Sequence, residues 1–197
     1  LDILQWLVGM PSSIRAYCSF GKYHDIEVED EVSAFFEFPN GATGQFTAGT
    51  GESPGTNRLE IVGDLGTVIT DGSEARLIRN SESVATFSRT TQEMFGTPAT
   101  TEELFKPMEA VNQHAAVLNN FIQAANGGAE LITPAAEGLH SLELAGAMIY
   151  SAWIDDTVKL PLDGAAYEAA LQERIAQSKP RQVVETAAKV DMSKSYR

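Results

Sequence analysis

Apolar and polar residues alternate with a period of two along much of the first half of the chain, which is typical of β-strands with one buried face. In one such run Val32, Ala34 and Phe36 share one side, while Ser33 and Glu37 share the other. The alternation predicts strands over Ser13–Gly21, Glu31–Pro39, Ala42–Thr50, Arg58–Val62, Gly66–Thr70, Ala75–Arg79 and Val84–Ser88.

Turn residues separate these runs. Asn40-Gly41 is the strongest hairpin signal, because both residues tolerate a positive φ. Further turns are indicated at Gly63-Asp64, Asp71-Gly72 and Asn80-Ser81. We therefore expect one antiparallel meander with an apolar face and a mixed polar face.

Helical spacing replaces the alternation in the second half. It predicts one helix from the recurrence of Val111, Ala115, Leu118, Ile122 and Ala125, ending at Gly127-Gly128. Thr133-Pro134 is a cap and first-turn pair. It opens a second helix, with a stripe formed by Leu139, Leu142, Gly146, Ile149 and Trp153.

Shorter elements complete the pattern. The apolar opening residues predict a short helix that Gly9-Met10-Pro11 ends. The connection over residues 90–107 contains a predicted short helix at Thr101–Phe105, and Val158–Leu162 is a predicted last strand. Asp163 or Gly164 caps a third helix with Tyr167, Leu171 and Ile175. Beyond Lys179-Pro180 the chain is weakly patterned, and we expect an extended tail.

Strands in one block followed by helices in another predict an α+β fold. We expect a large, mostly antiparallel open sheet with helices packed on one face. The chain does not begin with Met and its first helix has no capping signal, so we expect a chain cut within an element. We assign residues 1–165 to the α+β domain and residues 166–197 to a C-terminal helix and tail.

Charge narrows the range of partners. The chain has 27 acidic residues and 14 Lys plus Arg, a net charge of −13, and no basic run. Binding to phosphate groups needs a basic patch, so we expect neither nucleic acid nor an anionic membrane surface as a partner. No segment is long and apolar enough to span a bilayer, and no secretory signal opens the chain. The single cysteine, Cys18, fits a reducing cytoplasm, and we expect a cytoplasmic location.

The glycine-rich run at residues 49–55 has the composition of a phosphate-binding loop. A dinucleotide fingerprint needs a strand before it, a helix after it and an acid about 20 residues further on. Here a predicted strand follows the run, so we interpret it as a turn or a loop on the substrate side.

The segment Lys22–Asp30 carries the richest chemistry, with a cation, a phenol, an imidazole and several carboxylates between two strands. Such groups can donate hydrogen bonds to, and accept them from, a substrate rich in hydroxyls. Composition alone favours a solvated charged loop. No metal site is expected, because His24 and Asp25 are adjacent and no cysteine cluster accompanies them. His114 and His140 fit ordinary helix positions, and Cys18 fits a core strand.

Five blocks resemble, in the same order, the glucose–fructose oxidoreductase / inositol dehydrogenase / MocA (Gfo/Idh/MocA) family. They are Leu1–Gly9, Lys22–Asp30, Asn40–Gly44, Pro54–Gly66 and Thr133–Trp153. The resemblance covers about residues 1–165. It implies a C-terminal α+β domain of the glyceraldehyde-3-phosphate-dehydrogenase type, beside a Rossmann domain that binds NAD or NADP in the full-length parent. Such proteins act on sugars, inositols and related polyols.

The resemblance also assigns roles. The family's catalytic Lys and His would lie upstream of Leu1, so no catalytic and no cofactor-binding residue is expected here, and this piece alone should be inactive. A substrate-binding role is implied for Tyr23, His24 and Asp25 in one loop and for Thr56 and Asn57 in another. A homodimer or homotetramer formed through the sheet is expected. Two alternatives remain: a non-catalytic sugar-binding or scaffold module, and a regulatory family member without activity.

Overall fold

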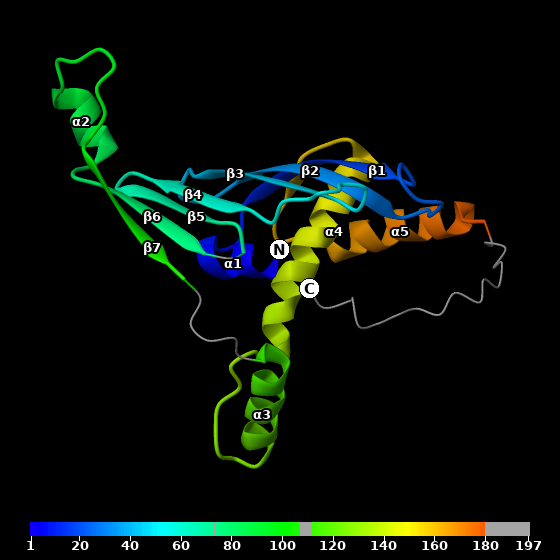
Figure 1. Cartoon of the computed structure of the whole chain (residues 1–197). Coiled ribbons are helices and arrows are strands. Elements are labelled where there is room, and N and C mark those ends of the chain that lie inside the picture. Colours follow the sequence, from blue (N-terminus) through cyan, green and yellow to red (C-terminus); the bar gives the residue numbers. More distant parts are fainter. Residues whose placement is uncertain (73, 107–111, 180–197) are drawn as a thin grey trace. The chain divides into compact units, whose positions relative to one another are not determined.

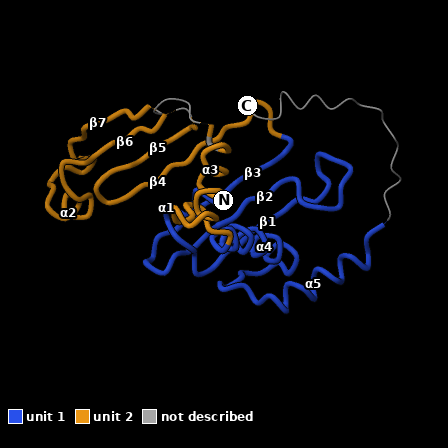
Figure 2. The backbone as a smooth tube through the Cα atoms, turned by 90° about the horizontal axis from the view of Figure 1, so that it is seen from below, with its two compact units in different colours: residues 1–51, 136–197 blue, residues 52–135 orange. Residues whose placement is uncertain are grey.

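The computed structural model describes residues 1–72, 74–106 and 112–179. It divides into two compact units, as Figure 2 shows: residues 1–51 with 136–197 form unit 1, and residues 52–135 form unit 2. Each unit contains one four-stranded antiparallel sheet (Figure 1). No helix among these described residues has the length and apolar character needed to cross a membrane.

Unit 1 is a sheet with strand order β3-β2-β1-β8. Its hairpin between β2 and β3 is closed by the Phe38 N–H donating to the Ala42 carbonyl at 2.9 Å, and Gly41 adopts a φ of 84°. The Asn40-Gly41 turn is thus confirmed. The elements of this unit are α1 (Asp2–Val8), β1 (Ser13–Phe20), β2 (Glu29–Glu37), β3 (Thr43–Gly49), α4 (Gly138–Ile154), β8 (Val158–Lys159) and α5 (Gly164–Gln177).

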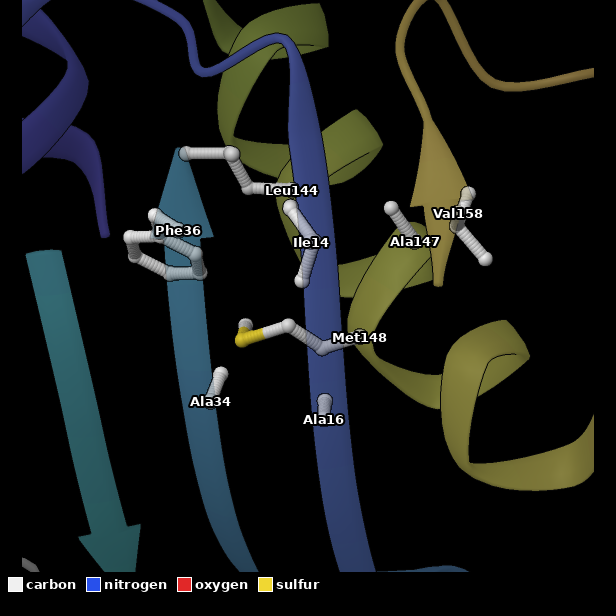
Figure 3. Close-up of a cluster of buried hydrophobic side chains, with 8 residues drawn as sticks. All are labelled: Ile14, Ala16, Ala34, Phe36, Leu144, Ala147, Met148 and Val158. Atoms are coloured by element: carbon white, nitrogen blue, oxygen red, sulfur yellow. The ribbon is translucent and has the colours of Figure 1, made fainter. Parts of the chain in front are cut away.

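The core of unit 1 lies between the apolar sheet face and α4 (Figure 3). The alternation predicted from the sequence places Ala34 and Phe36 of β2 on this face, and both are buried. The buried set is Ile14, Ala16, Ala34, Phe36, Leu144, Ala147, Met148 and Val158. Helices α1 and α5 contact α4. One helix therefore covers the sheet directly, and two others pack on that helix.

The predicted stripe on α4 is wrong in part. Leu139 and Leu142 are 63% and 68% exposed, and a different stripe, which includes Leu144 and Ser151, meets β1. Trp153 of the predicted stripe stacks on Tyr167 of α5 with ring centroids 5.6 Å apart. Since α4 is apolar on more than one side, spacing alone did not select the face that the sheet covers.

Unit 2 is a meander with strand order β4-β5-β6-β7. The side chain of Asn112 caps α3 by accepting from the Ala115 N–H at 3.1 Å, and Gly127 follows the helix end with a φ of 74°. Val111, which begins the predicted spacing, lies outside the described residues. The elements are β4 (Leu59–Gly63), β5 (Gly66–Thr70), β6 (Ala75–Asn80), α2 (Val84–Thr90), β7 (Thr100–Phe105), α3 (Gln113–Ala125) and a short turn of 3-10 helix, Ala135–Glu137, at the boundary of the two units.

Two predicted elements of unit 2 are of the opposite type. The predicted strand Val84–Ser88 is helix α2, because the Ser83 hydroxyl accepts from the Thr86 N–H at 3.1 Å and the Asp64 carboxylate accepts from the Ala85 N–H at 2.9 Å. The predicted helix Thr101–Phe105 is strand β7, because the edge of β6 offers it a hydrogen-bonding partner over six residues. For β7 the partner is a strand distant in sequence, whereas α2 is capped both by its own neighbour Ser83 and by the distant Asp64.

The α+β class is confirmed, with antiparallel sheets and helices packed against a sheet face. The single meander is not: the strands form two separate ladders, with β3 at one edge of the first and β4 at one edge of the second. The glycine-rich run at residues 49–55 is part of the segment that connects β3 to β4. Asp163 caps α5 as expected, accepting from the Ala165 and Ala166 N–H groups. The tail from residue 180 lies outside the described residues.

Candidate functional site

A buried carboxylate organises the loop between β1 and β2. Asp30 is only 2% exposed. Its two oxygens accept the backbone N–H groups of Lys22, Tyr23 and His24 at 3.1, 2.7 and 3.1 Å. Three consecutive donors converge on one side chain, so the loop is fixed at its centre by a single residue of β2.

The register of β2 explains why Asp30 faces inward. It has the same parity as Val32, Ala34 and Phe36, which line the apolar face. Burial opposes ionisation of its carboxyl, but the backbone hydrogen bonds from Tyr23, Lys22 and His24 outweigh burial, and the pKa of Asp30 lies below its ordinary value. Asp30 is therefore an anion at neutral pH, and its charge is met by oriented backbone dipoles.

Glu31 holds the same loop from the opposite face of the sheet. It accepts from Lys22 Nζ at 2.7 and 2.8 Å, from Ser19 Oγ at 2.9 Å and from the Tyr23 hydroxyl at 3.0 Å. The hydrogen bond from Lys22 is the largest of the causes that lower the pKa of Glu31. Lys22 Nζ also lies 4.9 Å from the centre of the Tyr23 ring, within cation–π range.

His24 is connected to both Asp30 and Thr50. Its Nδ1 lies 3.2 Å from Thr50 Oγ1 and 3.5 Å from an Asp30 carboxylate oxygen. Thr50 in turn donates its backbone N–H to the Asp30 carbonyl at 2.9 Å, and its hydroxyl lies 3.3 Å from the same carbonyl. The imidazole is half exposed, so one edge is held by the protein while the other can meet a ligand.

A shallow hollow of about 220 Å³ adjoins this cluster. It lies where β2 begins and β3 ends, close to the fixed loop. Its lining is formed by Glu29, Asp30, Glu31, Val32, Ala48, Gly49 and Thr50. The surface exposed in the hollow is mostly apolar, and the exposed side chains of Tyr23 and His24, which can bond a hydroxyl, lie outside its lining.

The end of α5 secures the far part of the loop. The Glu27 carboxylate accepts from the Ser178 hydroxyl and from the Lys179 N–H, the latter at 3.0 Å. The hydrogen bond from Ser178 is the main cause that lowers the pKa of Glu27. The loop is therefore held by Asp30 of β2 and by the residues that follow α5.

The structure brings together some of the residues that the sequence singled out. Tyr23 and His24 belong to one bonded cluster in unit 1, and Asp25 lies exposed beside them. Thr56 and Asn57 are exposed in the segment before β4, which belongs to unit 2. Within the described ranges, no group of three or more His, Cys, Asp or Glu is arranged to hold a metal ion.

Sequence reasoning missed the residues that position the loop, namely Asp30, Glu31 and Thr50. A signal for Asp30 was present: an acid at an inward position of a strand whose other inward residues are apolar must have compensating donors. Nothing comparable pointed to Glu31 or Thr50, because their contacts come from pairing between segments distant in sequence.

The glycine-rich run at residues 49–55 has no dinucleotide-binding geometry. It leads from β3 into β4, and the strands on either side of it are antiparallel members of their sheets. A nucleotide pyrophosphate would need a strand, a tight loop and a helix N-terminus in succession. The residues of this run therefore do not fit a nicotinamide cofactor.

Three of the solved structures with a similar fold are two oxidoreductases and an NAD-binding protein. The WlbA dehydrogenase from Bordetella pertussis, solved with NADH and UDP-GlcNAcA, is 27% identical with a TM-score of 0.57, covering 82% of this chain and 44% of that one. An NAD-binding protein from Listeria innocua is 25% identical with a TM-score of 0.58, covering 80% and 44%. Aldose-aldose oxidoreductase from Caulobacter crescentus, at 24% identity and a TM-score of 0.59, covers 81% and 44% and shares the fold.

The chain spans less than half the length of these proteins. None of the curated proteins compared with the chain matches it. The family model described as the C-terminal alpha/beta domain of the Gfo/Idh/MocA oxidoreductase family matches residues 1–160. With that match over most of its length, the chain belongs to the Gfo/Idh/MocA oxidoreductase family and represents its C-terminal alpha/beta domain.

Proposed function

We propose that this chain supplies the substrate-binding part of an NAD(P)-dependent oxidoreductase that acts on a sugar, an inositol or a related polyol. Family membership and the likeness to a dehydrogenase solved with NADH and UDP-GlcNAcA support the reaction class. The observation that carries the substrate class is the loop between β1 and β2, where buried Asp30 fixes Tyr23 and His24 beside an open hollow.

Tyr23, His24 and Asp25 are proposed as substrate contacts from unit 1, and Thr56 and Asn57 as contacts from unit 2. All five side chains are exposed. The residues of unit 1 offer a phenol, an imidazole and a carboxylate, and those of unit 2 offer a hydroxyl and an amide. Each of these groups can donate to or accept from a hydroxyl. The fixed backbone of Tyr23 and His24 reduces the entropy that a ligand would otherwise lose in ordering them.

The cofactor of the parent enzyme is proposed to be NAD or NADP, which when bound would carry the hydride. The glycine-rich run of this chain does not fit it, so no step of hydride transfer is assigned to these residues. We expect the chain alone to catalyse no oxidation of sugars. Adding NADH to this chain should produce neither a thermal shift nor a fluorescence change. Clear binding of NADH would contradict the proposal that the cofactor binds outside this chain.

The substrate assignment is tested in the full-length parent with a verified polyol substrate. We expect His24→Gln and Asp25→Asn to raise KM by about tenfold each. Each variant loses one hydrogen bond to the ligand, and a loss of about 1.4 kcal/mol in binding free energy weakens binding about tenfold. Val28→Ala is the matched control, because Val28 is an exposed residue of the same loop. Unchanged KM and kcat in both loop variants would remove His24 and Asp25 from the substrate site.

We also propose that the outer face of the unit 1 sheet forms a subunit contact. Phe35 and Tyr17 lie on the face opposite the core and are 41% and 64% exposed. Large apolar side chains on an open sheet face are typical of surfaces that a second copy covers. Light scattering should show a dimer or tetramer that Phe35→Glu weakens and Val28→Glu leaves intact. A strict monomer at high concentration would contradict this proposal.

A further inference from the structure

The hydrogen bonds around His24 determine which ring nitrogen carries the proton. Its Nδ1 faces two oxygen atoms, Thr50 Oγ1 at 3.2 Å and an Asp30 carboxylate oxygen at 3.5 Å. A neutral imidazole has one nitrogen that donates and one that accepts. Each neighbour therefore has to be assigned as a donor or an acceptor.

The carboxylate of Asp30 can only accept. It is ionised at neutral pH and already receives three backbone N–H groups, so it has no proton to offer Nδ1. A lone pair on Nδ1 would face the negative oxygen without a proton between them. That arrangement is repulsive, and it occurs in a region where the carboxylate is shielded from water.

Thr50 agrees with this assignment. Its hydroxyl has one proton and can donate it to the Asp30 backbone carbonyl at 3.3 Å. Its oxygen is then free to accept from Nδ1. With the proton on Nδ1, every contact in the group of His24, Asp30 and Thr50 pairs a donor with an acceptor.

We infer that His24 is held as the Nδ1–H tautomer and presents Nε2 as the acceptor for a hydroxyl proton of the substrate. The tautomer stands on the geometry alone, while the ligand class rests on the proposed function. Among the residues that the structure describes, none forms a hydrogen bond with Nε2, and the ring is 49% exposed. Asp30 and Thr50 are thus positioning residues for His24.

The inferred tautomer sets the specificity of this position. A nitrogen with a lone pair accepts from a free hydroxyl but gains nothing from an ether or a deoxy position, which have no proton to donate. A site built to bond a hydroxyl strongly disfavours an analogue without it, since its own polar group is then left unpaired. The position should therefore select free hydroxyls.

Nitrogen-15 NMR of this chain tests the tautomer directly. The chain has three histidines, so His24→Gln assigns the His24 signals by their loss. At pH 8 we expect a protonated, pyrrole-like Nδ1 and an unprotonated Nε2 for His24. Solvated imidazole in water favours the opposite form, and exposed His140 serves as the reference. A protonated Nε2, or an equal mixture of tautomers, at His24 would overturn the inference.

Two variants measure separately how much Thr50 and Asp30 each contribute to the tautomer population of His24. Thr50→Val keeps the shape of the side chain while it removes the hydroxyl, and we expect it to shift the His24 population toward the reference form. Asp30→Asn should do so more strongly, because the repulsion that excludes an Nδ1 lone pair is lost. If the wild-type population persisted in both variants, neither residue would position His24, and the inference would fail even with a correct tautomer.

The hydroxyl partner is tested by titrating the same labelled chain with myo-inositol and with its hexamethyl ether. We expect myo-inositol to move the Nε2 resonance toward the protonated range and the ether to leave it in place. Shifts at Tyr23 and His24 amides with a static Nε2 would disprove the hydroxyl contact but leave the proposed function intact. No shift in the loop with any cyclic polyol would count against the proposed function, while the tautomer result would stand.

Discussion

The ring of Tyr23 lies directly against Gly51, so closely that a Cβ added to Gly51 would come within 2.4 Å of the ring. Both residues belong to unit 1: Tyr23 lies in the fixed loop between β1 and β2, and Gly51 follows β3. The absence of a side chain at position 51 therefore lets Tyr23 reach Glu31 with its hydroxyl.

Gly51→Ala should displace the Tyr23 ring and loosen the loop. Overpacking costs about 1–3 kcal/mol, and the gain of about 0.4–1 kcal/mol from a less flexible unfolded chain offsets only part of it. We expect a net loss of about 1 kcal/mol in urea unfolding. Gly55→Ala is the control, because the nearest atom to its added Cβ is 3.6 Å away. Equal stability of the two variants would contradict the role given to Gly51.

Ser151→Ala should destabilise unit 1 although it removes a single oxygen. Ser151 is fully buried, accepts the Ala16 N–H at 2.9 Å and donates to the Asp156 carbonyl at 2.6 Å. It bonds the edge of β1 just where the two-residue strand β8 no longer pairs with it. A buried N–H left without a partner costs about 1–3 kcal/mol. Urea unfolding followed by tryptophan fluorescence measures this cost.

Ser88→Ala provides the comparison for Ser151→Ala, since Ser88 is an exposed serine within helix α2. A surface substitution of this kind should stay within about 0.5 kcal/mol of the wild type. The two variants lose the same atom and differ in burial and bonding. A small effect in both would show that the Ala16 N–H finds another acceptor.

The face of α4 that meets the sheet can be tested with one substitution at two positions. Leu144→Ala removes a side chain that is 1% exposed and should cost about 2–5 kcal/mol, through lost burial and a cavity. Leu142→Ala, at 68% exposure on the same helix, should cost less than about 0.5 kcal/mol. Denaturation midpoints of both variants decide which stripe is the core. The reverse order would restore the stripe predicted from spacing.

Stability should fall on acidification, with the loop as one source. The pKa of Glu31 and that of Asp30 are lowered from ordinary values of 4.5 and 3.8, so the unfolded chain binds more protons as the pH falls. Their contribution is complete above about pH 5 and is lost as the pH drops through the lower folded values. Unfolding free energies from pH 7 to 3 should show a smaller acid loss in Glu31→Gln. Glu82→Gln, at an exposed position of unit 2, controls for the loss of one charge.

Cys18 should react slowly in the folded chain. Burial, with a smaller effect of Glu29, raises the pKa of its thiol from 9.0 to about 11. Only the thiolate reacts, so a two-unit increase leaves about 100-fold less of it at pH 8. Ellman's reagent should therefore modify Cys18, the single cysteine, slowly in buffer and rapidly in urea. Fast modification in buffer would place the thiol in a more open or more basic environment.

Local pattern determined much of this protein. The period-two runs specified the six strands β1 to β6, with Ala34 and Phe36 inward, and Asn40-Gly41 specified a hairpin. The cap of the third helix was narrowed to Asp163 or Gly164, and the structure shows that it is Asp163. These features depend on a few neighbouring residues, and for that reason they can be read without knowledge of the fold. The blocks that resemble the family likewise identified it correctly.

Only the tertiary structure decided the features that depend on partners far along the chain. Asp64 on the β4–β5 turn adds to the Ser83 cap at the start of helix Val84–Thr90, and the edge of β6 pairs with Thr100–Phe105 as a strand. The sheet selected which side of α4 is buried. Asp30 was visible as an acid, but its three backbone donors exist only once β1 and β2 pair. Burial and long-range hydrogen bonds outweigh the small local preferences of a short segment, so the positioning of His24 could not be predicted from the sequence.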